Sequence, residues 1–187
     1  MLYNLLYPLS DQVGLFNLFQ YITFRTGGAI LTSLFISFLI GPSIIGFLRS
    51  RQKYGQPIRE EGPKSHLIEK QGTPTMGGLM ILIALVVSTV LWADITNPYV
   101  WIVTGVTLTF GMIGFADDFL KVTRRSSKAI PGKVRLLIQF GISIVAYLLI
   151  IESIPPEMRD KLSYSLALPF AKNILIDLGL FFIPFAV

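Results

Sequence analysis

The sequence contains no cysteine, a single histidine and few charged residues. Without cysteine, the chain has no disulfide framework, no thiolate metal site and no cysteine nucleophile. Charged residues make up 14% of the 187 residues, whereas soluble globular proteins contain about a quarter. Hydrophobic residues make up 52% and are gathered in long uninterrupted runs. This composition excludes disorder, collagen and coiled coil, and it indicates an integral membrane protein.

Four apolar runs are long enough to cross a membrane as helices. A hydrocarbon core of about 30 Å requires roughly 17 to 25 apolar residues, and none of the four runs has Asp, Glu or Lys in its interior. The runs are 26–48, 76–93, 100–116 and 134–151. We therefore predict an all-α fold, a polytopic bundle of transmembrane helices, in which 1–187 belong to one membrane-embedded domain.

A fifth apolar run, 174–187, contains only 14 residues. As a helix it would span about 21 Å at 1.5 Å per residue, and no polar flank follows it. We expect this run to be part of a fifth membrane helix, and 1–187 to be the N-terminal part of a longer protein.

Basic residues are concentrated in two connections, 49–75 and 117–133, which together with Arg135 hold twelve of the sixteen Lys and Arg. Because such an excess stays on the cytoplasmic side, we predict that both loops are cytoplasmic and that the N-terminus lies outside. The net charge of +5 follows from these loops, so anionic membrane lipids rather than nucleic acid are the expected partners. Residues 1–24 are rich in Tyr and Phe, which favours a place in the outer headgroup layer.

An acidic pair, Asp117 and Asp118, lies in the segment Gly-Phe-Ala-Asp-Asp-Phe-Leu-Lys at the cytoplasmic end of the third run. Lys121 is four residues from Asp117 and three from Asp118, so a helix places it on the same face as both. One interpretation is an ordinary helix end closed by Asp–Lys pairs. The other is a site for a divalent cation and phosphates, because Mg²⁺ takes few protein carboxylates and completes its shell with water and phosphate oxygens.

A second motif, Lys-Gln-Gly-Thr-Pro-Thr-Met-Gly-Gly, leads from Lys70 into the second apolar run. Thr-Pro-Thr can cap a helix whose free amides favour anions, Lys70 adds a positive charge, and Gly77 and Gly78 allow close backbone approach. The alternative is a capped helix with small residues for interhelical packing. We interpret His66 as an interfacial polar residue, and Ser65 has no partners of the kind that a catalytic triad needs.

Together with the preceding Gly-Pro-Lys-Ser-His, these motifs resemble the phospho-N-acetylmuramoyl-pentapeptide transferase family. It belongs to the polyprenyl-phosphate N-acetylhexosamine-1-phosphate transferase superfamily. The resemblance implies a bacterial inner-membrane enzyme of about ten helices, a homodimer active in peptidoglycan synthesis. Such an enzyme transfers phospho-MurNAc-pentapeptide from UDP-MurNAc-pentapeptide to undecaprenyl phosphate with Mg²⁺, giving lipid I and UMP.

The resemblance also implies roles for individual residues. Asp117 and Asp118 match the acidic pair, with catalytic and metal-binding roles in which Asp118 lies nearer the metal. Four further residues match substrate-binding positions: Lys70, Thr75, Lys121 and Lys133. A further metal ligand and a histidine-rich loop are expected beyond Val187, so we expect 1–187 alone to be inactive.

Two alternatives remain open at the level of sequence. The first is a sister transferase that uses UDP-GlcNAc, because the loops that recognise the sugar are not among these residues. The second is a non-catalytic membrane module in which the acidic pair forms only a salt bridge at a helix end. The position of the pair at the membrane surface favours chemistry over transport, since transporters place ionisable residues near the midplane.

Overall fold

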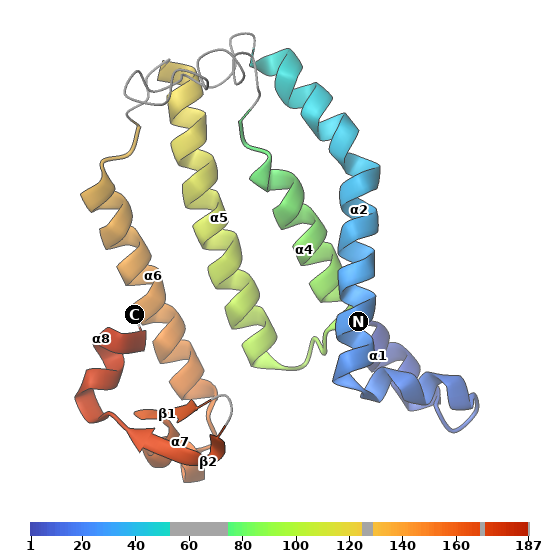
Figure 1. Cartoon of the computed structure of the whole chain (residues 1–187). Helices are drawn as coiled ribbons and strands as arrows, with labels where there is room; N and C mark the ends of the chain where they lie inside the picture. The colour runs from blue at the N-terminus through green and yellow to red at the C-terminus, as the bar shows by residue number, and fades with distance from the viewer. Residues whose placement is uncertain (53–74, 125–128, 169–170, 187) are drawn as a thin grey trace.

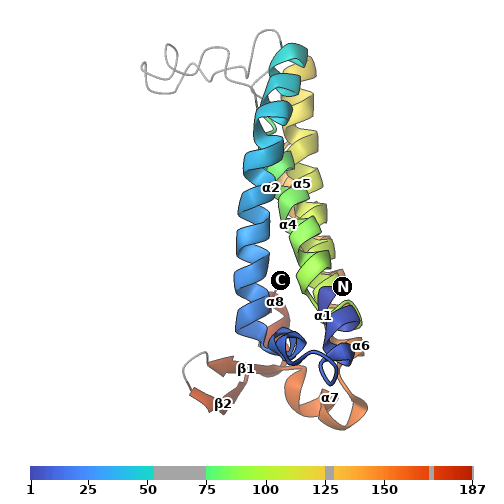
Figure 2. The same ribbon diagram turned by 90° about the vertical axis from the view of Figure 1, so that its right-hand side faces the viewer.

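Four helices standing side by side form the framework of the computed structural model, which describes residues 1–52, 75–124, 129–168 and 171–186 (Figure 1). The helices pack against one another in chain order, and a view turned by 90° shows the row from its edge (Figure 2). They are α2 (Ile22–Arg51), α4 (Gly78–Trp92), α5 (Pro98–Arg124) and α6 (Gly132–Ser153). The C-terminal ends of α2 and α5 and the N-terminal end of α4 lie at the same end of the row (Figure 1). This end carries the acidic pair and the described part of the second motif.

Three of these helices, α2, α5 and α6, are long and apolar enough to cross a membrane. The fourth, α4, has 15 residues and spans about 22 Å. It begins two residues later than predicted, because Met76 adopts a left-handed conformation and Gly77 forms a turn. The prediction of an all-α membrane bundle is confirmed, and the chain is an integral membrane protein.

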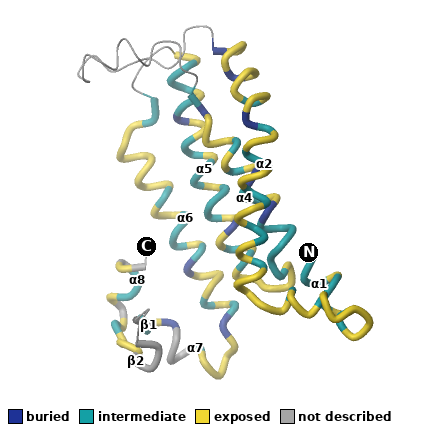
Figure 3. The backbone as a smooth tube through the Cα atoms, turned by 45° about the vertical axis from the view of Figure 1, so that its right-hand side comes forward, coloured by how far each residue is buried: buried dark blue, intermediate teal, exposed yellow. Residues whose placement is uncertain are grey.

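Much of each long helix is exposed (Figure 3), and the exposed residues include many large apolar ones. On α2, for example, Phe35 and Phe38 are 66% and 73% exposed. In water this much exposed apolar surface would drive aggregation. In a bilayer, lipid or neighbouring helices cover it, while the backbone hydrogen bonds are satisfied within each helix.

The helix α5 continues past residue 116, where we predicted the second cytoplasmic loop to begin. Residues 117–124 are helical, as the spacing of Lys121 from both carboxylates predicted, and the cytoplasmic side of this segment stays a prediction. Ionic pairs between Lys121 and the carboxylates one turn earlier stabilise the added turns. The acidic pair therefore sits on rigid helix rather than on a loop.

The N-terminal stretch folds into the short segments α1 (Leu2–Leu6), η1 (Tyr7–Leu9) and η2 (Gly14–Gln20). It lies at the end of the row opposite to the acidic pair (Figure 1). The Asn4 amide donates to Asp94 Oδ1 at 2.8 Å and accepts from the Ile95 amide at 3.2 Å. These bonds fasten the stretch to the connection between α4 and α5.

The prediction of a membrane helix over 174–187 is wrong for the described residues, which form other elements. Residues Ser165–Leu168 (β1) pair antiparallel with Ala171–Asp177 (β2). The apolar run is broken because the Asp177 carboxylate accepts from the Gly179 amide at 2.8 Å, and Gly179 takes a φ of +51°. The flanking segments are α7 (Pro156–Leu162), η3 (Gly179–Phe181) and α8 (Phe182–Ala186).

Buried contacts hold this C-terminal part against α6. The Tyr147 hydroxyl donates to the Ser163 carbonyl at 3.1 Å, and the Tyr147 ring lies 5.9 Å from that of Phe182. The β1–β2 hairpin thus lies at the same end of the row as the N-terminus, away from the acidic pair (Figure 1).

Candidate functional site

Asp117 and Asp118 lie in the last two turns of α5 and differ in exposure. Asp117 is 6% exposed, whereas the side chain of Asp118 is 29% exposed. Successive residues on a helix diverge by about 100°, so the two carboxylates meet different surroundings. The buried carboxylate is fixed by protein contacts, and the other is open to a ligand.

Lys121 joins the two carboxylates, as the helical spacing predicts. Its Nζ lies 2.6 Å from Asp117 Oδ2 and 3.4 Å from Asp118 Oδ1. A buried carboxylate without a partner is strongly destabilising, so the shorter pair compensates the burial of Asp117. The ammonium group also reduces the repulsion between the neighbouring carboxylates.

Asp117 also connects α5 to the start of α6. Its Oδ1 accepts a hydrogen bond from the backbone amide of Ile130 at 3.1 Å. Arg135, in the first turns of α6, lies close enough for its charge to stabilise the carboxylate. Both oxygens of Asp117 therefore have partners within the protein, which fixes the orientation of the group.

Thr75 reaches the same cluster from a segment 43 residues away in the sequence. Its Oγ1 donates to Asp118 Oδ2 at 2.7 Å. This hydroxyl comes from the segment that opens α4, so the second motif and the acidic pair meet in space. The family resemblance implies substrate binding for Thr75, which stays a prediction, and the structure shows that Thr75 holds Asp118.

Gln52 is a member of this cluster that the sequence analysis missed. Its Oε1 accepts from the Thr75 amide at 2.9 Å, and its Nε2 donates to the Thr75 carbonyl at 3.2 Å. Met76 follows with a φ of +70°, unusual for a residue with a side chain. No sequence signal distinguishes Gln52, because its partners are backbone groups, which do not depend on the type of residue.

The remaining predicted residues are placed as follows. Lys133 is exposed in the first turn of α6. Lys70, together with Ser65 and His66, lies outside the described residues. The structure therefore brings Thr75 together with the acidic pair and Lys121, and it places Lys133 on α6, three residues after Ile130.

Of the two carboxylates that the resemblance implies as metal ligands, Asp118 is the one open to Mg²⁺, because both oxygens of Asp117 have protein partners. Mg²⁺ is commonly held by one or two carboxylates, with waters and phosphate oxygens filling the other positions. Within the ranges that the structure describes, no cluster of three or more His, Asp or Glu is present. Asp118 would thus supply the protein part of such a site, with phosphate groups as further ligands.

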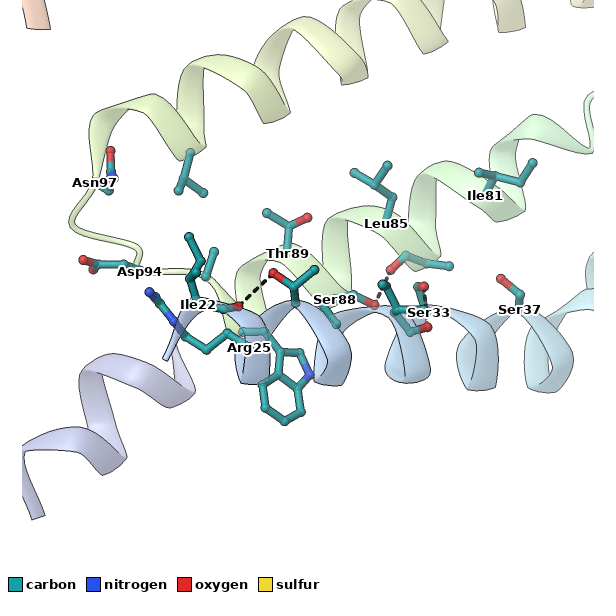
Figure 4. Close-up of a pocket in the computed structure, with 17 residues that line it drawn as sticks. Ile22, Arg25, Ser33, Ser37, Ile81, Leu85, Ser88, Thr89, Asp94 and Asn97 are labelled. Atoms are coloured by element: carbon teal, nitrogen blue, oxygen red, sulfur yellow. Dashed lines mark hydrogen bonds between the residues drawn. The ribbon is translucent and has the colours of Figure 1, made fainter. Parts of the chain in front are cut away.

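A separate cavity of about 540 Å³ lies between α2 and α4, at the other end of the row (Figure 4). Small hydroxyl residues line it, and Arg25, Asp94 and Asn97 stand at its end near the α4–α5 connection (Figure 4). Hydrogen bonds from the Thr96 hydroxyl and then from Asn4 hold the pKa of Asp94 below its usual range. Asp94 and its partners therefore stabilise the connection between α4 and α5. The cavity is lined by none of the predicted site residues.

Comparison with known proteins agrees with the two motifs. Residues 70–82 match the family model described as phospho-N-acetylmuramoyl-pentapeptide-transferase signature 1. A relative from Granulibacter bethesdensis, named phospho-N-acetylmuramoyl-pentapeptide-transferase, is 53% identical over 182 residues. The alignment covers 97% of this chain and 49% of the relative, so the chain spans about half the relative's length. The signature and this identity show that the chain belongs to the phospho-N-acetylmuramoyl-pentapeptide transferase family.

Proposed function

We propose that the whole protein transfers phospho-MurNAc-pentapeptide from UDP-MurNAc-pentapeptide to undecaprenyl phosphate, giving lipid I and UMP in peptidoglycan synthesis. The observation that carries this proposal is the convergence of Thr75, Lys121 and the acidic pair at one end of the membrane helices. A lipid phosphate and a water-soluble sugar nucleotide can meet only at such an interface. The name of the relative supports the choice of substrate.

In the proposed reaction, an oxygen of the lipid phosphate attacks the β-phosphorus of the sugar nucleotide. The bond between this phosphorus and the bridging oxygen breaks, and UMP leaves. The second pKa of a phosphate monoester is about 6, so the attacking group is already mostly deprotonated at neutral pH. Asp117, which is held by Lys121 and the Ile130 amide, therefore acts mainly by orienting the lipid phosphate through Lys121, whose ammonium group it fixes.

Charge compensation is the second requirement, because the diphosphate and the lipid phosphate repel each other. Lys121 lies between both carboxylates, and Lys70 and Lys133 supply further positive charge from the two basic loops. A bound Mg²⁺ would offset the diphosphate charge and stabilise the leaving UMP. Asp118, with its more exposed side chain, would be the main protein ligand. Asp117 could be a second ligand only by giving up its contact with Lys121 or with the Ile130 amide.

We also propose a location for the whole protein. The steep excess of basic residues in 49–75 and 117–133 supports a bacterial inner-membrane protein with its N-terminus outside. The site then faces the cytoplasm, where a sugar nucleotide is available. Membrane lipids cover the exposed apolar faces, a homodimer is the expected assembly, and nucleic acid is not an expected partner.

The alternatives are a sister transferase that uses UDP-GlcNAc and a non-catalytic module. A salt bridge at a helix end would not require Thr75, 43 residues from Asp118 in sequence, to donate to the carboxylate. The test supplies the full-length protein in membranes with each nucleotide sugar, radiolabelled in the sugar phosphate. We expect label on lipid from UDP-MurNAc-pentapeptide. Label only from UDP-GlcNAc, or no label on lipid from either, would contradict the proposal.

A further inference from the structure

We propose that Gln52 is a positioning residue of the transferase site, which sets the orientation of Asp118 through Thr75. This inference rests on the proposed function and adds a residue to its site. Gln52 is uncharged, yet it lies between basic residues at the cytoplasmic end of α2 and is only 7% exposed. Its own backbone amide donates to the Leu48 carbonyl at 2.9 Å, which fixes its position at the end of the helix.

The side chain of Gln52 binds both polar groups of one residue. Its Oε1 accepts from the Thr75 amide at 2.9 Å, and its Nε2 donates to the Thr75 carbonyl at 3.2 Å. Only a side chain that carries both a donor and an acceptor can make this pair of bonds. Together they fix the translation and the rotation of the Thr75 backbone.

The backbone beside Thr75 needs such support. Met76 is 9% exposed and has a φ of +70°, a region that residues with a side chain rarely occupy. A left-handed residue persists where the surrounding structure holds it. The two bonds from Gln52 hold the residue immediately before it.

The orientation passes from Thr75 to the acidic pair. With its backbone fixed, Thr75 directs Oγ1 at Asp118 Oδ2, at 2.7 Å. The other oxygen, Oδ1, then faces Lys121 Nζ at 3.4 Å. Gln52 thus determines which oxygen of Asp118 binds the hydroxyl and which remains toward the lysine and the substrate.

The first test measures hydrogen exchange by mass spectrometry in a peptide that spans Thr75, in the full-length protein. The Q52M variant keeps the side-chain length but loses both bonds, and Q52E keeps the acceptor for the Thr75 amide. We expect faster exchange in Q52M, and exchange near the wild-type rate in Q52E and in the control Q20M, on the exposed N-terminal segment. Unchanged exchange in Q52M would overturn the proposal.

The second test measures turnover with UDP-MurNAc-pentapeptide and undecaprenyl phosphate. We expect Q52M to lower kcat about tenfold or more, with the KM for the sugar nucleotide within about twofold, because the bonds act through Asp118 rather than on the nucleotide. Q52E is expected to lose about threefold or more, since it lacks the donor to the Thr75 carbonyl. If Q52M is recovered unfolded, Q52E decides alone, and wild-type kcat in that variant overturns the proposal.

A double-mutant cycle separates positioning from general stability. If Gln52 acts through the Thr75 hydroxyl, Q52M added to T75V should lower kcat by less than about twofold further. Additive losses would show that Gln52 acts by another route and would overturn the inference. Wild-type protein without any transfer would instead refute the proposed function, so the two failures are distinguishable.

Discussion

Thr75 shows how a single hydroxyl links two segments that are remote in sequence. Its bond to Asp118 is charge-assisted and 2.7 Å long, and such bonds are among the stronger ones in proteins. Asp118 keeps a second oxygen toward Lys121. The site therefore depends on the hydroxyl for the direction of the carboxylate, while Lys121 supplies charge.

We expect Thr75→Val to reduce turnover about tenfold to a hundredfold, because a hydrogen bond to a charged group contributes about 1.5–3 kcal/mol. Valine matches threonine in shape and removes only the hydroxyl. Thr75→Ser keeps the hydroxyl and serves as the control, with turnover within about threefold of wild type. Steady-state kinetics of the purified full-length variants measure both values. Equal turnover in the valine and serine variants would show that the hydroxyl has no role.

The residues of the cluster differ in how far the sequence predicts them. Lys121 follows from helical spacing, since three and four residues separate it from the two carboxylates. The contact between Thr75 and Asp118 requires the packing of α4 on α5, which no local pattern contains. The sequence does not predict the role of Gln52 for a different reason. Gln52 binds the backbone of Thr75, and every residue offers a similar backbone.

At the scale of elements, close packing of α2 on α4 aligns the ends that carry Gln52 and Thr75. Gly28 of α2 lies directly against the indole ring of Trp92. The ring is held in place by a bond from its Nε1 to Thr32 Oγ1 at 2.9 Å and by stacking on Phe19 at 5.8 Å. A side chain at Gly28 would therefore force the helices apart.

We expect Gly28→Ala to lower the free energy of unfolding by about 1–3 kcal/mol, the usual cost of overpacking. Gly27→Ala is the matched control, since a methyl group there meets no neighbouring atom within 4 Å. The control should be neutral or slightly stabilising, because alanine favours helix over glycine by up to about 1 kcal/mol. Thermal unfolding in detergent compares the two variants. A lower melting temperature in Gly27→Ala than in Gly28→Ala would contradict this packing.

The sequence predicts the helices correctly where the apolar runs are long. The prediction is wrong where the run is short. The runs of α2, α5 and α6 contain enough apolar residues to cross a membrane. In lipid, a helix satisfies all of their backbone hydrogen bonds within one segment. The run 174–187 has only 14 residues and includes Asp177, whose carboxylate forms a turn with the Gly179 amide. This local hydrogen bond stabilises a turn, which interrupts the apolar run and prevents a continuous helix.

At the scale of the molecule, the distribution of charge sets which end faces the cytoplasm. The acidic cluster shares one end with the basic residues in the last turns of α2 and α5, and the N-terminal stretch and the β1–β2 hairpin share the other (Figure 1). An enzyme that takes a soluble sugar nucleotide needs the first end inside the cell. Orientation and function are therefore linked.

Single cysteines can test this orientation, because 1–187 contain none. In full-length protein freed of any other cysteine, we expect Ser10→Cys to react with a membrane-impermeant maleimide added to intact spheroplasts. Ser50→Cys, at the C-terminal end of α2, should react only after the membrane is opened. The opposite pattern would place the cluster outside and contradict the proposed site.

A further expectation concerns residues 1–187 expressed alone. We expect them to insert in the membrane, because each long helix is apolar enough to enter the bilayer by itself. Transfer to lipid should be absent, and it should return when the rest of the full-length protein is supplied as a second polypeptide. Turnover by 1–187 alone would show that these residues hold the whole site.

The most direct test of the account follows labelled sugar phosphate onto lipid in full-length protein. We expect Asp117→Asn and Asp118→Asn to lower turnover by about a hundredfold or more, while binding of UDP-MurNAc-pentapeptide changes by less than about threefold. Asp94→Asn at the opposite end keeps an acceptor oxygen for Thr96 and should transfer label as wild type does. Wild-type turnover in both acidic-pair variants would contradict the central claim that this pair carries out the transfer.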